Sequence, residues 1–512
     1  MEKLEVESRD RPTFLRERAP SLLRDDEPKF PRIIGTIGLM VALFGIMAIC
    51  VTQSGRKGPF GLGWGSFFLA WGLGGILYHA AADKEQQIRR SYTILGGLLC
   101  IAGIVFSIVR FQDQAGSLFL LGVLCFVFAL LFVLAGLRHE TDEKWRKWIL
   151  LAVGGAGAMA ALTGFVGGNV VSKGEFLLPY GLLLAVLGVF YIGAFVGLSG
   201  TSSDLGYRAG QTMGVLGAFA FLVALIRSFF PGFLVANGFI LMCLGILYLA
   251  TSVAFCSDRP IVVLTRRELA TFFYSPIAYI VLIGLTCVAW VYFWLFLSQV
   301  VIQMQRGIPV VEPIVQHYIF GLFPVILMIF VVPVLTMRLL SEEKRTGTLE
   351  VLLTAPVNET AVVLSKFLAS LVFLLLAWVP WGLFLVALRV ENGKAFDFRP
   401  LLSFGIAMTF MGAGFMSMGL FFSSLTRNQI ASAVLAFVGM ILLTGLALIK
   451  FNMEDSSPTN PWVTVLAQVS YIELWFRSLE GQLNPRLLVY HLSATVLWLF
   501  MTVKVLESRR WS

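Results

Sequence analysis

Residues 341–360 form the charged stretch of this sequence whose residue types could do specific work, and they read SEEKRTGTLEVLLTAPVNET between two long apolar runs. Ser341 can cap a helix, and acidic residues in a first helical turn interact favourably with the helix dipole. Glu343 and Glu350 are seven residues apart, near one face of a helix, and Pro356 ends the element. The pattern predicts a short amphipathic helix on a membrane surface. The spacing leaves a solvated loop between two spans as an open alternative.

A second charged element, residues 258–271, stands before another long apolar run. It carries Arg266, Arg267 and Glu268 shortly before Pro276. This arrangement predicts an interfacial helix that leads into the next membrane span, and we refer to it as the lead-in helix. An anchor that only sets the topology through its positive charge is the competing interpretation.

Motifs for catalysis, nucleotide binding and metal binding are missing from the sequence. A phosphate-binding loop reads GxxxxGK[ST], and the nearest fragment, at residues 392–395, lacks the first glycine and the hydroxyl. There is no GxSxG or HExxH pattern. The 4 histidines are scattered, and the 6 cysteines fall in or beside apolar runs, where they suit a packed core. We therefore expect no catalytic residue, no metal and no bound cofactor on this chain, and no ATP hydrolysis by it alone.

The composition indicates what must position the two charged elements. Of the 512 residues, 58% are hydrophobic and only 13% are charged, whereas a soluble domain carries about 25% charged residues. The apolar runs are about 20 residues long, the length of a membrane-spanning helix. These values exclude an ordinary soluble enzyme, a disordered chain and a nucleic-acid binder that works through a basic face. They predict an all-α polytopic membrane protein with the lipid bilayer as its surroundings.

We count about fourteen apolar runs, in a group of eight and a group of six that are separated by a polar break at about 257–269. The predicted organisation is a flexible cytoplasmic tail at 1–32, an eight-span membrane domain of unknown role at 33–256, and a six-span domain at 257–512. The runs lie at about 33–53, 60–80, 92–110, 115–137, 147–171, 176–199, 209–229, 232–256, 276–300, 316–340, 361–388, 401–423, 427–449 and 486–506.

The distribution of Lys and Arg predicts the orientation. With the N-terminus in the cytoplasm, the inner loops and the tail hold 27 of these residues and the outer loops hold 12. Cytoplasmic loops carry the excess of positive charge in membrane proteins, so both termini are predicted to be cytoplasmic. No Asp or Glu lies in the middle of any run. That absence disfavours a proton- or sodium-coupled carrier, which uses a buried carboxylate.

The long outer segment at about 450–485 has apolar and aromatic residues at spacings of three and four. The spacing predicts an amphipathic or re-entrant helix. A substrate gate and an ordinary belt of interfacial aromatic side chains both fit it. The residues in the pattern are Trp462, Leu466, Val469, Ile472, Trp475 and Phe476.

Residues from about 258 to 512 resemble an ABC-2 type transporter permease, and within that group the gliding-motility-like export permeases. The six runs, the predicted inner termini and the long fifth loop agree with that pattern. The eight runs before residue 257 are additional to it and resemble nothing that we recognise. The stretches that carry the resemblance are RRELATFFYSPIAYIV (266–281), SEEKRTGTLEVLLTAPV (341–357), VSYIELWFRSLEGQLNPRLLVYHLS (469–493) and VLESRRW (505–511).

The resemblance implies a permease subunit of an ATP-driven exporter in the plasma (bacterial inner) membrane. Two permeases, alike or different, would pair above two separate ABC ATPase subunits that bind the ATP, and nucleic acid has no part. It implies that Arg266, Arg267 and Glu268 support the lead-in helix. The residues that it implies for coupling to the ATPase are Glu342, Glu343, Lys344, Arg345, Thr346, Gly347, Thr348 and Glu350.

Two alternatives remain open from the residues alone. An ion-coupled secondary transporter is consistent with fourteen spans. A membrane assembly or sensory component is consistent with the glycine pairs Gly61/Gly65, Gly164/Gly168 and Gly193/Gly197, which allow close helix packing. The sequence does not reveal a substrate, since a lipid, a polysaccharide, a peptide or a drug would fit equally well.

Overall fold

The structure of this protein is a computed structural model, and all of its regular elements within the described residues are helices. The predicted tail, residues 1–32, lies outside the described residues except for 29–32. The described residues are 29–53, 62–82, 85–109, 116–138, 140–166, 181–199, 204–227, 229, 238–307, 314–319, 322–348, 358–390, 399–456 and 461–510.

Each of the fourteen predicted apolar runs contains a helix, which confirms the all-α polytopic class. The helices are α1 (Lys29–Gln53), α2 (Leu62–Ala82), α3 (Gln86–Val109), α4 (Gly116–Leu137), α5 (Glu143–Val166), α6 (Leu182–Ser199), α7 (Asp204–Arg227), α8 (Phe239–Cys256), α9 (Pro260–Tyr274), α10 (Pro276–Gln305), α11 (Ile314–Ile319), α12 (Leu322–Thr336), α13 (Ser341–Thr346), α15 (Glu359–Val390), α16 (Arg399–Leu425), α17 (Gln429–Ser456), α18 (Pro461–Val469), α19 (Tyr471–Leu479) and α20 (Pro485–Arg510).

Not every predicted run passes as a membrane span in the part of the chain that the structure describes. Within the described residues, 11 helices are long and apolar enough to cross a membrane, or up to 12 if the bent pair α8 and α9 is one span. That pair is bent by 97° at its break. In α4 the apolar helix that is described, Leu121–Leu137, is shorter than the rest. The count of fourteen spans is therefore not confirmed.

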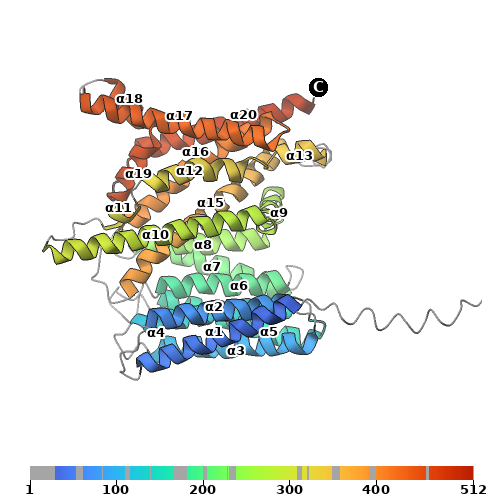
Figure 1. Ribbon diagram of the computed structural model, residues 1–512. Coiled ribbons are helices and arrows are strands. Elements are labelled where there is room, and N and C mark those ends of the chain that lie inside the picture. Colours follow the sequence, from blue (N-terminus) through green and yellow to red (C-terminus); the bar gives the residue numbers. More distant parts are fainter. Residues whose placement is uncertain are drawn as a thin grey trace, which may run out of the picture. The chain divides into compact units, whose positions relative to one another are not determined.

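The chain divides into two compact units, Met1–Met159 and Ala160–Ser512, with the boundary inside α5. The predicted domain boundaries after residues 32 and 256 stay predictions. In the first unit, α1 packs along α2 and α3 packs along α4 (Figure 1). The first pair is very close, since a Cβ atom on Gly72 would lie 2.3 Å from the backbone nitrogen of Ala42. Such contact needs glycine at the crossing point.

The glycines singled out in the sequence also face neighbouring helices of this chain. A Cβ atom on Gly65 would lie 2.7 Å from the Ile49 side chain, and one on Gly164 would lie 2.7 Å from the nitrogen of Ala185. Gly61 and Gly168 lie outside the described residues. These contacts favour packing within the chain over binding of a partner.

A buried ion pair joins α3 to the turn before α5 in the first unit. Arg90 donates from Nη2 to Oε1 of Glu140 over 2.9 Å, and Gln86 donates to the same oxygen over 2.9 Å. The Glu140 side chain is only 2% exposed. The hydrogen bond from Arg90 lowers the pKa of Glu140 to about 2.

This pKa predicts how acid affects the first unit. An unfolded Glu has a pKa of about 4.3. Because the folded value is lower, the stabilisation by Glu140 is present above pH about 4.3 and is lost as the pH falls toward 2. We expect Glu140→Gln to lower the thermal stability at pH 7 and to match the unchanged protein near pH 2. Unfolding followed by circular dichroism across this range checks it, and a difference between the two proteins that does not vary with pH contradicts it.

The second unit has a large core to which α10, α12, α15, α16 and α19 contribute (Figure 1). Aromatic side chains occupy its middle. Trp378 stacks beside Trp381 at a centroid distance of 5.2 Å, and Trp475 meets Trp378 edge to face at 5.4 Å. The core therefore links α15 directly to α19.

The outer segment contains the predicted amphipathic element, split into α18 and α19. In α19, Tyr471 is 1% exposed and Trp475 is 0% exposed. In α18, Trp462 is 65% exposed. The interfacial-belt interpretation therefore suits Trp462, whereas Trp475 is a core residue that packs against α15.

Candidate functional site

The lead-in helix is α9, and its ends follow from local sequence. Pro260 occupies the first turn, where its missing N–H is not needed. The helix stops before Ser275, because the residue that precedes a proline avoids the helical region, and Pro276 then begins α10. α9 packs along α15. The prediction of a helix before this span is confirmed.

The predicted coupling helix begins at Ser341 as α13, but Ser341 does not cap it. Its side chain donates backward to the carbonyl of Met337, so this prediction was wrong. The hydroxyl of Ser423, from α16, accepts hydrogen bonds from the N–H groups of Leu340 and Ser341 at 3.0 and 3.1 Å. The cap comes from a distant helix because the chain enters α13 through a turn that directly continues α12.

Gly347 ends α13 after six residues. Its φ is 74°, in the left-handed region that favours glycine, and it forms the C-terminal cap. Gly347 therefore makes the turn that ends α13. The rest of the predicted element, residues 349–357 with Glu350 and Pro356, lies outside the described residues.

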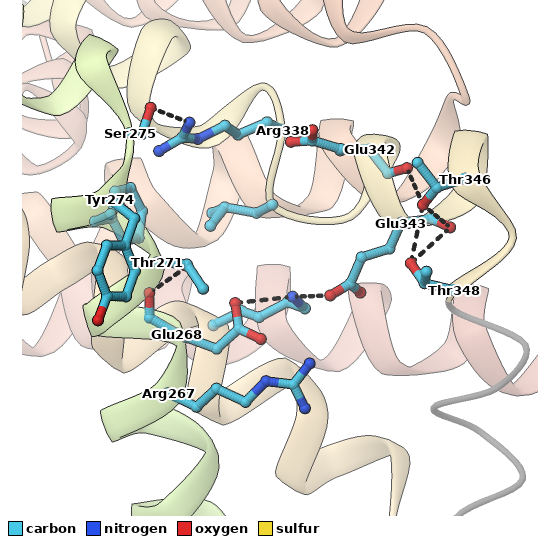
Figure 2. Close-up of a pocket in the computed structure, with 13 residues that line it drawn as sticks. Arg267, Glu268, Thr271, Tyr274, Ser275, Arg338, Glu342, Glu343, Thr346 and Thr348 are labelled. Carbon is cyan, nitrogen blue, oxygen red and sulfur yellow. Dashed lines mark hydrogen bonds and ion pairs between the residues drawn. The ribbon is translucent and has the colours of Figure 1, made fainter. Parts of the chain in front are cut away.

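Lys366 of α15 lies between two carboxylates from different elements, those of Glu268 and Glu343, which are labelled in Figure 2. Its Nζ donates to Oε2 of Glu268, in α9, over 3.0 Å. It also donates to Oε1 of Glu343, in α13, over 2.6 Å. The lysine side chain is 2% exposed, and those of Glu268 and Glu343 are 15% and 23% exposed. We call these three residues the lysine cluster.

The lysine cluster borders an open pocket of about 540 Å³. Two arginines, Arg267 and Arg338, and a third carboxylate, that of Glu342, also line it (Figure 2). Among the described residues, no group of three His, Cys, Asp or Glu side chains could hold a metal ion. The lining residues are Arg267, Glu268, Thr271, Phe272, Tyr274, Ser275, Arg338, Leu339, Glu342, Glu343, Thr346, Thr348 and Lys366.

A second contact connects the end of α9 to the turn before α13. Arg338 donates to the hydroxyl of Ser275 over 2.5 Å. Its guanidinium lies 5.4 Å from the centre of the Phe272 ring, at a distance that suits a cation–π contact. Two sets of contacts therefore connect α9 to the segment that contains α13: the lysine cluster and the hydrogen bond from Arg338 to Ser275.

On the opposite side, α13 is fastened to α16. Lys344 is 8% exposed and donates to the carbonyl of Ser424. Together with the bonds to Ser423, this contact holds the start and the middle of α13 against the end of α16.

Comparison with known proteins gives one match. Residues 117–489 match the family described as ABC-2 family transporter protein. The chain belongs to this family. The match begins in α4, so it reaches well beyond the resemblance noted from residue 258 and takes in part of the region that we did not recognise. Searches of curated proteins and of solved structures found no match.

As a member of this family, the protein is a permease component of a transporter, with a membrane setting and an ABC ATPase partner implied by the family. Permeases of this kind are membrane subunits and are generally not catalytic themselves. The contacts of the site just described join α9, α13, α15 and α16 to one another.

The predicted coupling residues differ in burial and in the direction of their side chains. The side chains of Glu343 and Lys344 point inward to α15 and α16, and Glu342 is half-buried at the pocket. The remaining described positions, Arg345, Thr346, Gly347 and Thr348, are exposed. Thr346 and Thr348 share a hydrogen bond of 2.9 Å that holds the tip in shape. Of the predicted set, the exposed tip is the part open to a partner.

The lead-in residues also divide by direction. Arg266 donates to the carbonyls of Ala254 and Phe255 at the end of α8, both over 3.4 Å. Arg267 and Glu268 face the pocket. The roles implied for these three residues, in supporting α9 and in coupling, stay predictions.

Sequence reasoning missed Lys366 as a site residue. It was counted only as a basic residue near an inner membrane edge. The available signal was a lysine two turns inside an apolar helix that begins at Glu359. Because a charge at that depth is expensive unless it is paired, such a lysine should have prompted a search for a carboxylate.

Proposed function

We propose that this permease is the membrane subunit of an ATP-driven exporter and that a separate ABC ATPase docks on the exposed tip formed by Arg345, Thr346, Gly347 and Thr348. The supporting observation is the arrangement of α13. Its inner side is fastened to α15 and α16 by Lys366, Ser423 and Ser424, while its tip is exposed. A short helix held in this way can pass a rigid-body displacement to the spans behind it.

The wider assembly follows the same proposal. Two permeases, identical or different, stand in a plasma (bacterial inner) membrane with their termini in the cytoplasm, above two ATPases that hold the ATP. Hydrolysis is the work of those subunits. This chain positions α13, keeps α9 and α15 in contact with it, and guides the cargo in a gliding-motility-like or related export system.

The exposed tip is tested by adding bulk and reversed charge there. The permease is purified with the ATPase encoded beside its gene, in nanodiscs, and Arg345→Glu and Thr348→Trp are compared with the unchanged protein. We expect ATPase affinity to fall at least about tenfold, because changes at the centre of an interface typically have effects of that size or more. Arg486→Glu, an exposed arginine at the start of α20, is the matched control and should bind normally.

Two outcomes would go against the proposal. Unchanged binding and unchanged ATPase stimulation in both tip variants would remove the role of the tip. Transport driven by an ion gradient alone, in liposomes without the ATPase, would place the protein among secondary carriers instead.

A further inference from the structure

Lys366 lies where three separate segments of the chain meet. Its side chain is 2% exposed, and its ammonium contacts the carboxylate of Glu268 from α9 and that of Glu343 from α13. An ammonium buried to this extent is stable only when it is paired and hydrogen-bonded. The position of the lysine on α15 therefore determines where both carboxylates can lie.

The lysine cluster itself holds two carboxylates and one ammonium, and Arg267 is a further cation at the same pocket. Two carboxylates share one ammonium, and Oε2 of Glu343 is a buried oxygen without a hydrogen-bond partner among the described residues. Without Lys366, Glu268 and Glu343 would face each other as like charges, which repel. Lys366 thus offsets the repulsion between the carboxylates of Glu268 and Glu343 by donating a hydrogen bond to each of them.

The other bonds described for α13 and the turn before it each connect only two segments of the chain. Lys344 and the hydroxyl of Ser423 fasten α13 to α16. Arg338 joins the end of α9 to the turn before α13 through its hydrogen bond to Ser275 and its contact with the Phe272 ring. Only the lysine cluster, among the bonds described here, joins α9, α13 and α15 at one point.

We propose that Lys366 is the positioning residue that makes the lead-in helix, the coupling helix and span α15 respond to the ATPase together. This inference rests on the proposed function. It assigns Glu343 to internal transmission, whereas the family resemblance implied contact with the ATPase. Without the charge of Lys366, the ATPase still docks on the exposed tip of α13, but its binding no longer alters α9.

The experiment measures hydrogen exchange in α9 of the full chain, in nanodiscs, with and without the ATPase and a non-hydrolysable ATP analogue. In the unchanged permease, we expect ATPase binding to slow exchange in α9. In Lys366→Met, we expect binding affinity within about threefold of the unchanged value, since the tip is intact. We expect the coupling between ATPase binding and exchange in α9 to fall about tenfold, within the range usual for coupled sites.

Two variants separate coupling from simple loss of structure. Lys366→Arg keeps the charge and should retain at least part of the response. Glu268→Gln leaves the pair between Lys366 and Glu343 in place, so it should lose the response in α9 alone and should fold even if Lys366→Met does not.

The outcomes distinguish the two proposals. If the ATPase does not bind the unchanged permease, the proposed function fails. If it binds, and both Lys366→Met and Glu268→Gln keep the full response in α9, the role of Lys366 is overturned while the proposed function stands. If Lys366→Met folds normally but loses ATPase binding altogether, the cluster shapes the docking surface and the assignment to transmission is wrong.

Discussion

Replacing Lys450 by methionine is expected to destabilise this permease by about 3–5 kcal/mol, because it leaves Glu473 buried without its main counter-charge. Lys450, near the end of α17, is 5% exposed and donates to Oε2 of Glu473 over 2.9 Å. Glu473 is 8% exposed, and Arg477 donates to its other oxygen over 2.5 Å. Although burial favours the protonated form, these two hydrogen bonds hold the pKa of Glu473 below its ordinary value.

The loss should depend on charge and not on the size of the side chain. Lys450→Arg keeps the cation and should lose much less than Lys450→Met. Adding Glu473→Gln to Lys450→Met removes the carboxylate that has lost its buried ammonium and keeps only Arg477, and it should restore part of the stability. Thermal unfolding in detergent, followed by circular dichroism, measures all three. A melting temperature of Lys450→Met equal to that of the unchanged protein would show that the pair contributes nothing.

Trp475→Ala should destabilise the permease by a similar amount, about 3–5 kcal/mol, through the cavity that it leaves. The indole is 0% exposed and meets the Phe404 ring at 5.3 Å and the Trp378 ring at 5.4 Å. Through these two rings α19 packs against both α15 and α16. Its removal should loosen the outer segment first.

Trp462→Ala is the matched control, since it removes the same side chain from the adjacent helix. Trp462 is 65% exposed, so we expect an effect within about 0.5 kcal/mol. Unfolding in detergent and protease sensitivity of residues 461–479 compare the two variants. Equal losses for Trp462→Ala and Trp475→Ala would contradict the core position of Trp475.

The helices of this protein could be predicted from its sequence because their cause is local. In a bilayer, each backbone N–H and C=O must find its partner within its own helix, so a run of about 20 apolar residues becomes a helix wherever it occurs. The start of α9 at Pro260 and the turn at Gly347 follow equally local rules. The number of full spans stays a prediction, because 11 helices, or up to 12 with the bent pair α8 and α9, pass as spans within the described residues.

The sequence predicts which segments form the candidate site, but not the direction in which their side chains point. The charged segments around Glu268 and Glu343 were found, because so few charges occur in this chain. Their roles within the fold depend on Lys366, which lies 98 residues from Glu268 and 23 from Glu343 in the sequence. A spacing pattern describes one helix, and it carries no information on which helix packs against which.

The sequence by itself therefore determined the membrane class, the helix positions and the family that residues 258–512 resemble. The tertiary structure alone decided that Glu343 points inward, that Ser423 rather than Ser341 satisfies the start of α13, and that Trp475 is buried while Trp462 is not. The physical reason is the same in each case. Helix formation depends on neighbours in the chain, whereas burial, pairing and capping here depend on atoms supplied by helices that are distant in sequence.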